Sequence, residues 1–263
     1  MRPIAVFDSG VGGLTSLKVL EQLLPGEDLI YFGDTSRVPY GTRSKETILQ
    51  YAAQDVRFLR TFDPQAVLVA CGTVSSVALD ALRASVPDLP LFGVVESSVE
   101  AALKQSKNKR ILVLGTPATI ASGSYANLLS AAGATVATAA CPLFVPLVEN
   151  GHIMREDPIA QKAVEYYLQP MKEFGADTVI LGCTHYPLLR DLIADFMGEK
   201  VNLIDVGRES ALACQAAVQK ETGTKGRVRF FVSDTAESFE KTARIFLGRD
   251  MKEEVEQIDI QSY

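Results

Sequence analysis

Short apolar runs alternate along this chain with longer segments in which apolar residues recur every three or four positions. The runs are apolar at nearly every position and end at small or polar residues, which is typical of strands covered on both faces. Nine runs are predicted to be strands: Ile4–Phe7, Leu29–Phe32, Ala66–Ala70, Leu91–Val95, Ile111–Leu114, Thr135–Ala139, Thr178–Leu181, Val201–Ile204 and Val228–Val232. The segments with helical periodicity include Leu14–Leu24, Lys45–Phe62, Ile159–Phe174 and Arg208–Glu221. This succession predicts an α/β fold with mostly parallel, doubly covered sheets.

Two stretches of the chain resemble each other. Val67–Thr73 and Val179–Thr184 are each an apolar strand that ends at a cysteine and is followed closely by threonine. The runs Ile4–Phe7 and Ile111–Leu114 precede them at a similar distance. Coincidence is an alternative, because strand ends resemble one another. Duplication would give two similar α/β domains with the active site in the cleft between them, since parallel sheets bind ligands at the carboxyl ends of their strands.

The chain length is compatible with two domains. There are 263 residues, and a typical domain has about 100–150. No low-complexity linker separates the halves. We expect a discontinuous first domain of residues 1–96 plus 207–263 and a second domain of residues 97–206.

Composition and charge narrow the classes of partner. Hydrophobic residues make up 47% and charged residues 22%, as in ordinary globular proteins. The net charge of −6 disfavours a general nucleic-acid binder, which needs clustered lysine and arginine. No apolar run approaches the roughly 18 residues of a membrane-spanning helix, and the first residues do not resemble a signal peptide. We therefore expect a cytoplasmic protein with reduced thiols and with neither a nucleic acid nor a membrane as partner.

Cysteine and histidine supply the remaining candidate chemistry. The chain contains Cys71, Cys141, Cys183, Cys214, His152 and His185. The spacing matches neither a C-x-x-C metal or redox motif nor a disulfide scaffold, so we expect no metal site. Cys141 and Cys214 lie in apolar surroundings, and we interpret them as packing residues, a common role of free cysteines.

Cys71 and Cys183 stand where a predicted strand stops and a helix starts. Thr73 follows the first, and Thr184 and Pro187 follow the second. A helix N-terminus offers unpaired N–H groups and a positive dipole end, which favour thiolate over thiol and can hold a carboxylate. Each position therefore combines a candidate base with an anion site.

Three further residues lie near these motifs. His185 is close enough to Cys183 to tune it, although a purely structural histidine is an alternative. Asp8 follows the first predicted strand and precedes Ser9 and a glycine-rich segment, where the main chain can approach a ligand closely. That segment is neither G-x-G-x-x-G nor a P-loop, so a phosphate-binding loop is a weak alternative. The pattern around Glu149 indicates only an acid in a turn.

Several segments together resemble the glutamate racemases of the aspartate/glutamate racemase family, and the resemblance covers essentially the whole chain. The segments are Phe7–Leu14, Tyr31–Thr35 with Pro39–Gly41, Ala70–Thr73, Pro146–Glu149 and Leu181–Leu189. The resemblance implies that Cys71 and Cys183 interconvert L-glutamate and D-glutamate from opposite faces, without pyridoxal phosphate, metal or other cofactor. It also implies a bacterial source, a role in supplying D-glutamate for peptidoglycan, and the homodimer that is usual in the family.

The same resemblance assigns roles to individual residues. Asp8, Glu149 and His185 would assist the two catalytic thiols. The implied substrate contacts are Asp8, Ser9, Tyr40, Gly41, Gly72, Thr73, Thr116, Thr119, Thr184 and His185.

Position 72 departs from the family pattern. The commonest form of the first cysteine motif is Cys-Asn-Thr, and an asparagine there would bind polar groups of the substrate, but this chain has Gly72. The rate and the substrate stringency are therefore open, and a racemase for another amino acid such as aspartate is an alternative. Another is a non-enzymatic binding or regulatory protein that kept the fold. His185 favours glutamate, because Cys-Thr-Glu is usual in aspartate racemases.

Overall fold

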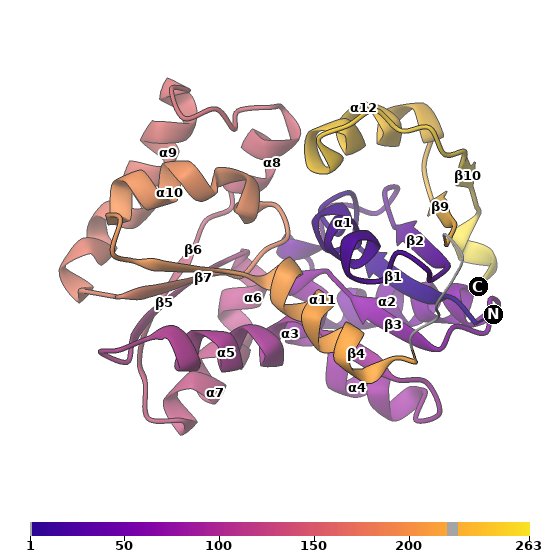
Figure 1. Cartoon of the computed structure of the whole chain (residues 1–263), viewed down its shortest axis with the longest axis horizontal. Helices are drawn as coiled ribbons and strands as arrows, with labels where there is room; N and C mark the ends of the chain where they lie inside the picture. Colours follow the sequence, from indigo (N-terminus) through magenta and orange to yellow (C-terminus); the bar gives the residue numbers. More distant parts are fainter. Residues whose placement is uncertain (1, 220–225) are drawn as a thin grey trace.

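The computed structural model describes residues 2–219 and 226–263 and contains two parallel sheets (Figure 1). The first sheet has the order β10-β9-β2-β1-β3-β4, with β1 (Ile4–Asp8), β2 (Leu29–Gly33), β3 (Ala66–Val69), β4 (Leu91–Gly93), β9 (Val228–Val232) and β10 (Val255–Gln257). The second has the order β6-β5-β7-β8, with β5 (Arg110–Gly115), β6 (Thr135–Ala140), β7 (Thr178–Leu181) and β8 (Asn202–Asp205). The prediction of an α/β fold with parallel sheets is confirmed.

Helices cover both sheets. The α-helices are α1 (Leu14–Leu23), α2 (Lys45–Arg60), α3 (Gly72–Val77), α4 (Leu79–Ser85), α5 (Val94–Gln105), α6 (Pro117–Ser122), α7 (Ser124–Ala131), α8 (Phe144–Glu149), α9 (Pro158–Leu168), α10 (Arg190–Met197), α11 (Val206–Ala217) and α12 (Ala236–Leu247). Four 3-10 turns are η1 (Tyr40–Thr42), η2 (Gln169–Phe174), η3 (Tyr186–Leu189) and η4 (Ile260–Ser262). None of these described helices is long and apolar enough to cross a membrane.

The apolar runs form strands because both of their faces are buried. In β1, Ile4 and Val6 pack into one hydrophobic cluster with residues of α1, α11 and α12. Ala5 and Phe7 point the other way, into a cluster with residues of α2 and α4. Burying a side chain of this size stabilises the fold by about 1.5–3 kcal/mol, so a run that is apolar at every position is favoured only between two helical layers.

Two of the predicted elements change into a different element part-way along, and one strand of the structure was not predicted. The run Leu91–Val95 is a strand only to Gly93, and its last two residues begin α5, because a short buried apolar run can start a helix as well as end a strand. The predicted helix Ile159–Phe174 ends at Leu168 and continues as η2, which contains Pro170, a residue without the N–H that an α-helix needs. The edge strand β10 was not predicted, since two of its three residues are exposed and polar.

The last predicted helix begins earlier than expected. Asp205 caps α11 by accepting hydrogen bonds from two main-chain N–H groups, so the helix starts at Val206. It ends at Ala217, whereas the prediction extended over Arg208–Glu221, of which positions 220 and 221 lie outside the described residues.

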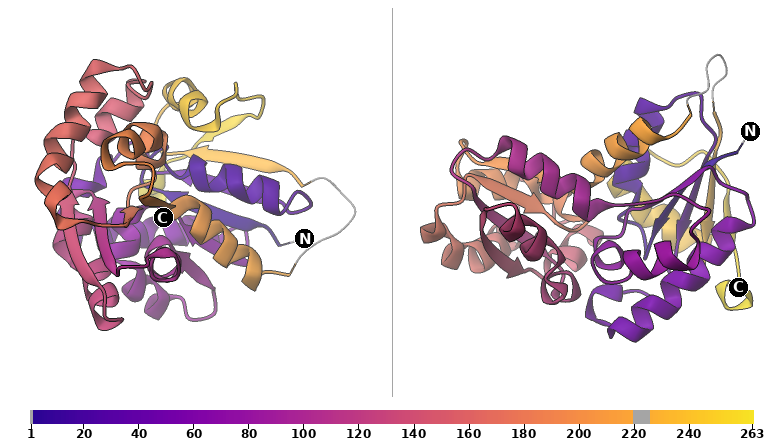
Figure 2. Two further views of the ribbon diagram at one scale, coloured as in Figure 1. Left: turned by 60° about the vertical axis from the view of Figure 1, so that its left-hand side comes forward. Right: turned by 90° about the horizontal axis from the view of Figure 1, so that it is seen from below.

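The two sheets lie in separate halves of the molecule, and α5 and α11 pack against each other between them (Figure 2). The domain boundaries that we expect, 96/97 and 206/207, fall within these two helices and stay a prediction. β1, β3, β5 and β7 end at the same cleft, because residues that follow them line one cavity.

Candidate active site

A cavity of about 340 Å³ lies between the two halves. Most of the predicted site residues line it: Ser9, Tyr40, Gly41, Cys71, Gly72, Thr73, Thr116, Glu149, Cys183, Thr184 and His185. Asp8 and Thr119 do not line it but are buried behind residues that do. Its remaining wall was not predicted and consists of Gly10, Val38, Pro39, Thr42, Pro117, Pro142, Val145 and Pro146. No periodic signal marks these residues, because they lie in loops and short helices.

Cys71 enters the cavity from the first half. It is the N-cap residue of α3, and its thiol donates a hydrogen bond to Ser9 Oγ at 3.3 Å. Burial, together with the nearby carboxyl of Asp8, raises the pKa of the Cys71 thiol to about 12. The expectation that the helix N-terminus would lower this pKa is therefore wrong, because the loss of solvation outweighs the hydrogen bonds from Ser9 and from the main chain of Val74, which lower it.

Cys183 enters from the second half and belongs to a chain of three side chains. Its sulfur lies 3.8 Å from Nδ1 of His185, and Nε2 of the same ring lies 2.8 Å from Glu149 Oε1. Burial disfavours the charged imidazole, but the contacts to Cys183 and Glu149 outweigh it and raise the pKa of His185 to about 10. A protonated His185 can donate a hydrogen bond to the Cys183 sulfur and stabilise negative charge on it.

Asp8 ends β1 beneath the cavity. Its Oδ1 accepts a hydrogen bond from the main-chain N–H of Gly10 at 3.0 Å, whereas its buried Oδ2 has no hydrogen-bond partner among the described residues. Burial raises the pKa of Asp8, and the nearby His185 opposes that shift. A buried carboxyl oxygen without a partner is costly, and such groups gather at functional sites.

Three threonine hydroxyls connect the halves beside the thiols. Thr73 Oγ1 of the first half lies 3.0 Å from Thr116 Oγ1 of the second, which in turn lies 2.9 Å from Thr119 Oγ1. Thr116 also caps α6 by accepting a hydrogen bond from the N–H of Thr119. The predicted contacts Thr73 and Thr116 therefore meet at one wall, and Thr119 orients Thr116 from behind.

Comparison with known proteins shows the family to which the chain belongs. The family described as Asp/Glu/Hydantoin racemase matches residues 15–214. The glutamate racemase of Aquifex aeolicus is 45% identical over 252 residues, which cover 96% of this chain and 96% of the relative. The chain belongs to the Asp/Glu/hydantoin racemase family. The family resemblance found in the motifs is confirmed.

Solved structures of racemases share the whole fold. Glutamate racemase from Francisella tularensis, solved in complex with D-glutamate, has a TM-score of 0.92 at 34% identity and covers 100% of this chain and 99% of its own. The Thermus thermophilus enzyme, solved with beta-chloro-D-alanine, has a TM-score of 0.89 at 35% identity and covers 100% of this chain and 98% of its own. An aspartate racemase from Picrophilus torridus, at 14% identity and a TM-score of 0.57, shares the fold alone.

A buried ionic cluster supports the cavity wall of this racemase. The Tyr40 hydroxyl contacts Asp34 and lies 3.0 Å from Asp55 Oδ2, and Arg37 contacts both carboxyls at 2.6 Å. The carboxyl pair thus holds the hydroxyl of Tyr40 and fixes the position of this residue at the cavity wall. Burial and the neighbouring Asp34 raise the pKa of Asp55, although Arg37 opposes the shift. The sequence motifs did not single out Arg37 or Asp55.

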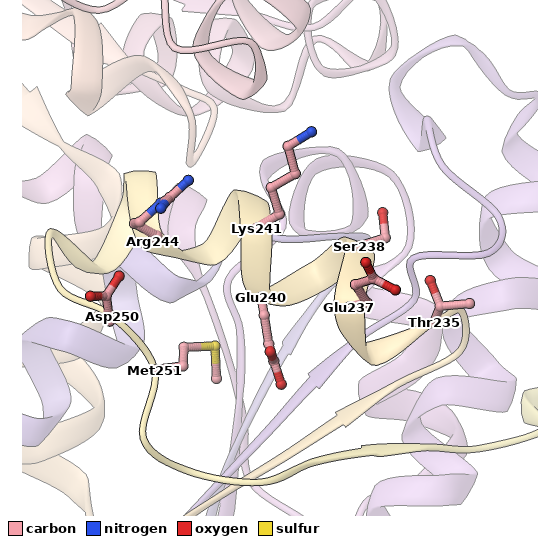
Figure 3. Close-up of a pocket in the computed structure, with 8 residues that line it drawn as sticks. All are labelled: Thr235, Glu237, Ser238, Glu240, Lys241, Arg244, Asp250 and Met251. Atoms are coloured by element: carbon pink, nitrogen blue, oxygen red, sulfur yellow. The ribbon is translucent and has the colours of Figure 1, made fainter.

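A second, larger hollow does not resemble a ligand site. It has about 620 Å³ and lies along α12 and the loop after it (Figure 3). Figure 3 shows Lys241 and Arg244 pointing to one side of α12 and Glu240 to the other, with Met251 on the loop that follows the helix. Binding sites have converging polar groups, which this hollow lacks. In the parts of the chain that the structure describes, no group of three or more histidine, cysteine or acidic side chains is arranged to hold a metal.

Proposed function

We propose that this protein interconverts L-glutamate and D-glutamate, with Cys71 and Cys183 as opposed acid/base thiols. One observation carries the proposal: the two cysteines follow β3 and β7 of different sheets and line the same cavity of about 340 Å³. Two thiols on opposite walls are the arrangement that proton exchange at both faces of one α-carbon requires.

The reaction needs no driving force, because the two enantiomers have equal free energy, but the α-carbon is a very weak acid. One thiolate removes the α-proton, and the electron pair that is left on the carbon is delocalised into the α-carboxylate. The opposite thiol then donates its proton to the other face. Cys71, whose pKa is raised to about 12, is suited to the acid role, and Cys183 beside His185 to the base role. The roles are exchanged for the reverse reaction, and exchange of protons with solvent restores them for another turnover in the same direction.

The cavity offers polar groups that can hold the carboxylates of a small amino acid. None of the described residues that line it is lysine or arginine, so carboxylates would be held by main-chain N–H groups and hydroxyls. Hydroxyls that line the cavity come from Ser9, Thr73, Thr116 and Thr184. Fixed donors in a closed, water-poor cleft stabilise the charge that develops on the carboxylate in the transition state.

The proposal extends to the biological setting. The bacterial relatives named glutamate racemase, such as those of Aquifex aeolicus and Persephonella marina, support a cytoplasmic enzyme that supplies D-glutamate for peptidoglycan. We also propose a homodimer, as is usual in the family.

The test follows the α-proton signal of L-glutamate by NMR in deuterated water, together with circular dichroism, without an added cofactor. We expect loss of the α-proton signal and decay of the optical activity at matching rates. L-aspartate is the matched second substrate, and preferential turnover of aspartate would replace glutamate in the proposal. A folded, reduced protein that exchanges neither would refute it and favour a binding protein with this fold.

A further inference from the structure

The two halves meet main chain to main chain beside the thiols. A Cβ atom placed on Gly72 would lie 2.3 Å from the carbonyl oxygen of Gly182, although real Cβ atoms essentially never approach another atom within 3.0 Å. Gly182 cannot easily retreat, because its N–H donates to Leu114 O at 2.8 Å and a Cβ on it would lie 2.5 Å from the same oxygen. We call this contact between Gly72 and Gly182 the glycine seam.

The glycine seam is formed by residues that are adjacent in the sequence to the two cysteines. Gly72 follows Cys71 directly, and Gly182 precedes Cys183 directly. Whatever sets the distance between the two main chains at the seam therefore also sets the distance between the two thiols.

Two other glycines of the first half approach the second half, but they meet side chains. A Cβ on Gly12 would lie 2.1 Å from Thr184 Oγ1, and one on Gly41 would lie 2.8 Å from Thr116 Cβ. The Thr184 hydroxyl can rotate away from such a contact, and Thr116 is the cap residue of α6 rather than part of a sheet, whereas Gly182 is held to β5 through its N–H. The seam is therefore the contact of the three that most rigidly limits closure.

We propose that Gly72 is a positioning residue of this particular chain: where the common motif carries asparagine, the missing side chain here lets the halves close further, and the spacing of Cys71 and Cys183 across one α-carbon is matched to that closure. This inference rests on the proposed function. An added Cβ needs about 1 Å more room to reach ordinary contact, since the distance must rise from 2.3 Å to 3.4 Å or more. A displacement of about 1 Å at a reacting centre can lower a rate by about 10²-fold.

Wider spacing has a chemical signature. Proton removal needs only one thiolate, whereas inversion also needs the opposite thiol within reach of the carbanion. When the opposite thiol is too far away, the carbanion takes a proton back from the sulfur that deprotonated it. In deuterated water that sulfur can first exchange its proton for deuterium, so the substrate gains deuterium at the α-carbon without inversion. The ratio of deuterium incorporation to inversion therefore rises.

The experiment compares Gly72→Ala with the wild-type protein in deuterated water, with incorporation measured by NMR and inversion by circular dichroism. We expect inversion to fall by about 10²-fold, and incorporation to fall much less. Gly133→Ala is the matched control, because position 133 has φ +83° and nothing within 4 Å of an added Cβ, so the change strains the main chain away from the cleft. We expect the control to leave the ratio of incorporation to inversion unchanged. An equal fall of both rates in Gly72→Ala would overturn the proposal.

A second measurement does not depend on activity. Cys71 and Cys183 are only 4% and 6% exposed, so the wider cleft of Gly72→Ala should speed their alkylation by iodoacetamide. Peptide mass spectrometry measures the alkylation of each cysteine over time. Cys141 and Cys214 are fully buried outside the seam and report general unfolding. Alkylation rates equal to those of the wild type would overturn the glycine seam as a limit on closure. Failure of the wild-type protein to exchange the α-proton would instead overturn the proposed function, while the alkylation rates still decide whether the seam limits closure.

Discussion

Replacing Glu149 by glutamine removes the carboxylate that lies 2.8 Å from His185 Nε2 and keeps the shape of the side chain. Burial opposes the charged imidazole, yet the contacts to Cys183 and Glu149 raise the pKa of His185 from 6.5 to about 10. A hydrogen bond between charged groups contributes about 1.5–3 kcal/mol. Because the Glu149 side chain is 39% exposed, solvent screening favours the lower end of that range. About 1.5 kcal/mol corresponds to about one pH unit, so we expect the pKa of His185 to fall by about that much in Glu149→Gln.

The pH dependence of stability checks the same reasoning. A folded-state pKa above the unfolded value means that the stability contributed by His185 is fully present below pH 6.5 and is lost as the pH rises through about 10. Urea unfolding should therefore show the variant less stable than the wild type by about 1.5 kcal/mol at pH 7, and this difference should vanish above the wild-type pKa. NMR titration gives the pKa directly, and the chain has only two histidines to assign. An unchanged pKa, or the same loss of stability at pH 7 and above pH 10, would refute the ion pair and point to packing instead.

Three further predictions concern the thiols and the buried cluster. Cys71→Ala should keep the fold but lower interconversion in both directions by at least about 10²-fold, as measured by circular dichroism, because one face loses its acid/base group; full racemisation would contradict the two-thiol mechanism. The rate at which iodoacetamide alkylates Cys71 should rise about tenfold per pH unit from pH 7 to 10, because only the thiolate reacts and burial raises the pKa of Cys71 to about 12. A rate that stops rising near pH 9 would contradict the raised pKa. Arg37→Met should destabilise the protein by about 3–5 kcal/mol in urea unfolding, because Asp34 and Asp55 would remain buried without their cation. The exposed ion pair of Arg60 is the control, with an expected loss below about 1 kcal/mol for Arg60→Met, and equal losses in the two variants would refute the reasoning.

The sequence by itself determined the fold class and all of the strands except the edge strand β10. The run Thr178–Leu181 is apolar at nearly every position, and the strand has the same bounds in the structure and is buried throughout, because a doubly covered sheet makes such a run favourable. The sequence also placed Cys71 and Cys183 at the carboxyl ends of strands, which is where parallel sheets bind their ligands. The family motifs added Glu149, which the local pattern indicates only as an acid in a turn.

The tertiary structure decided what depends on burial and on contacts between distant segments. Burial makes Cys71 a weak acid, although its place at a helix start suggested the opposite. The hydroxyl of Tyr40 turns to Asp55, fifteen positions away, and Glu149 reaches His185 across thirty-six. The closeness of Gly72 to Gly182 arises only when the two sheets close on each other. Local patterns record which side chains are buried, but solvation and the spacing between halves are properties of the whole packed chain, so no short segment encodes them.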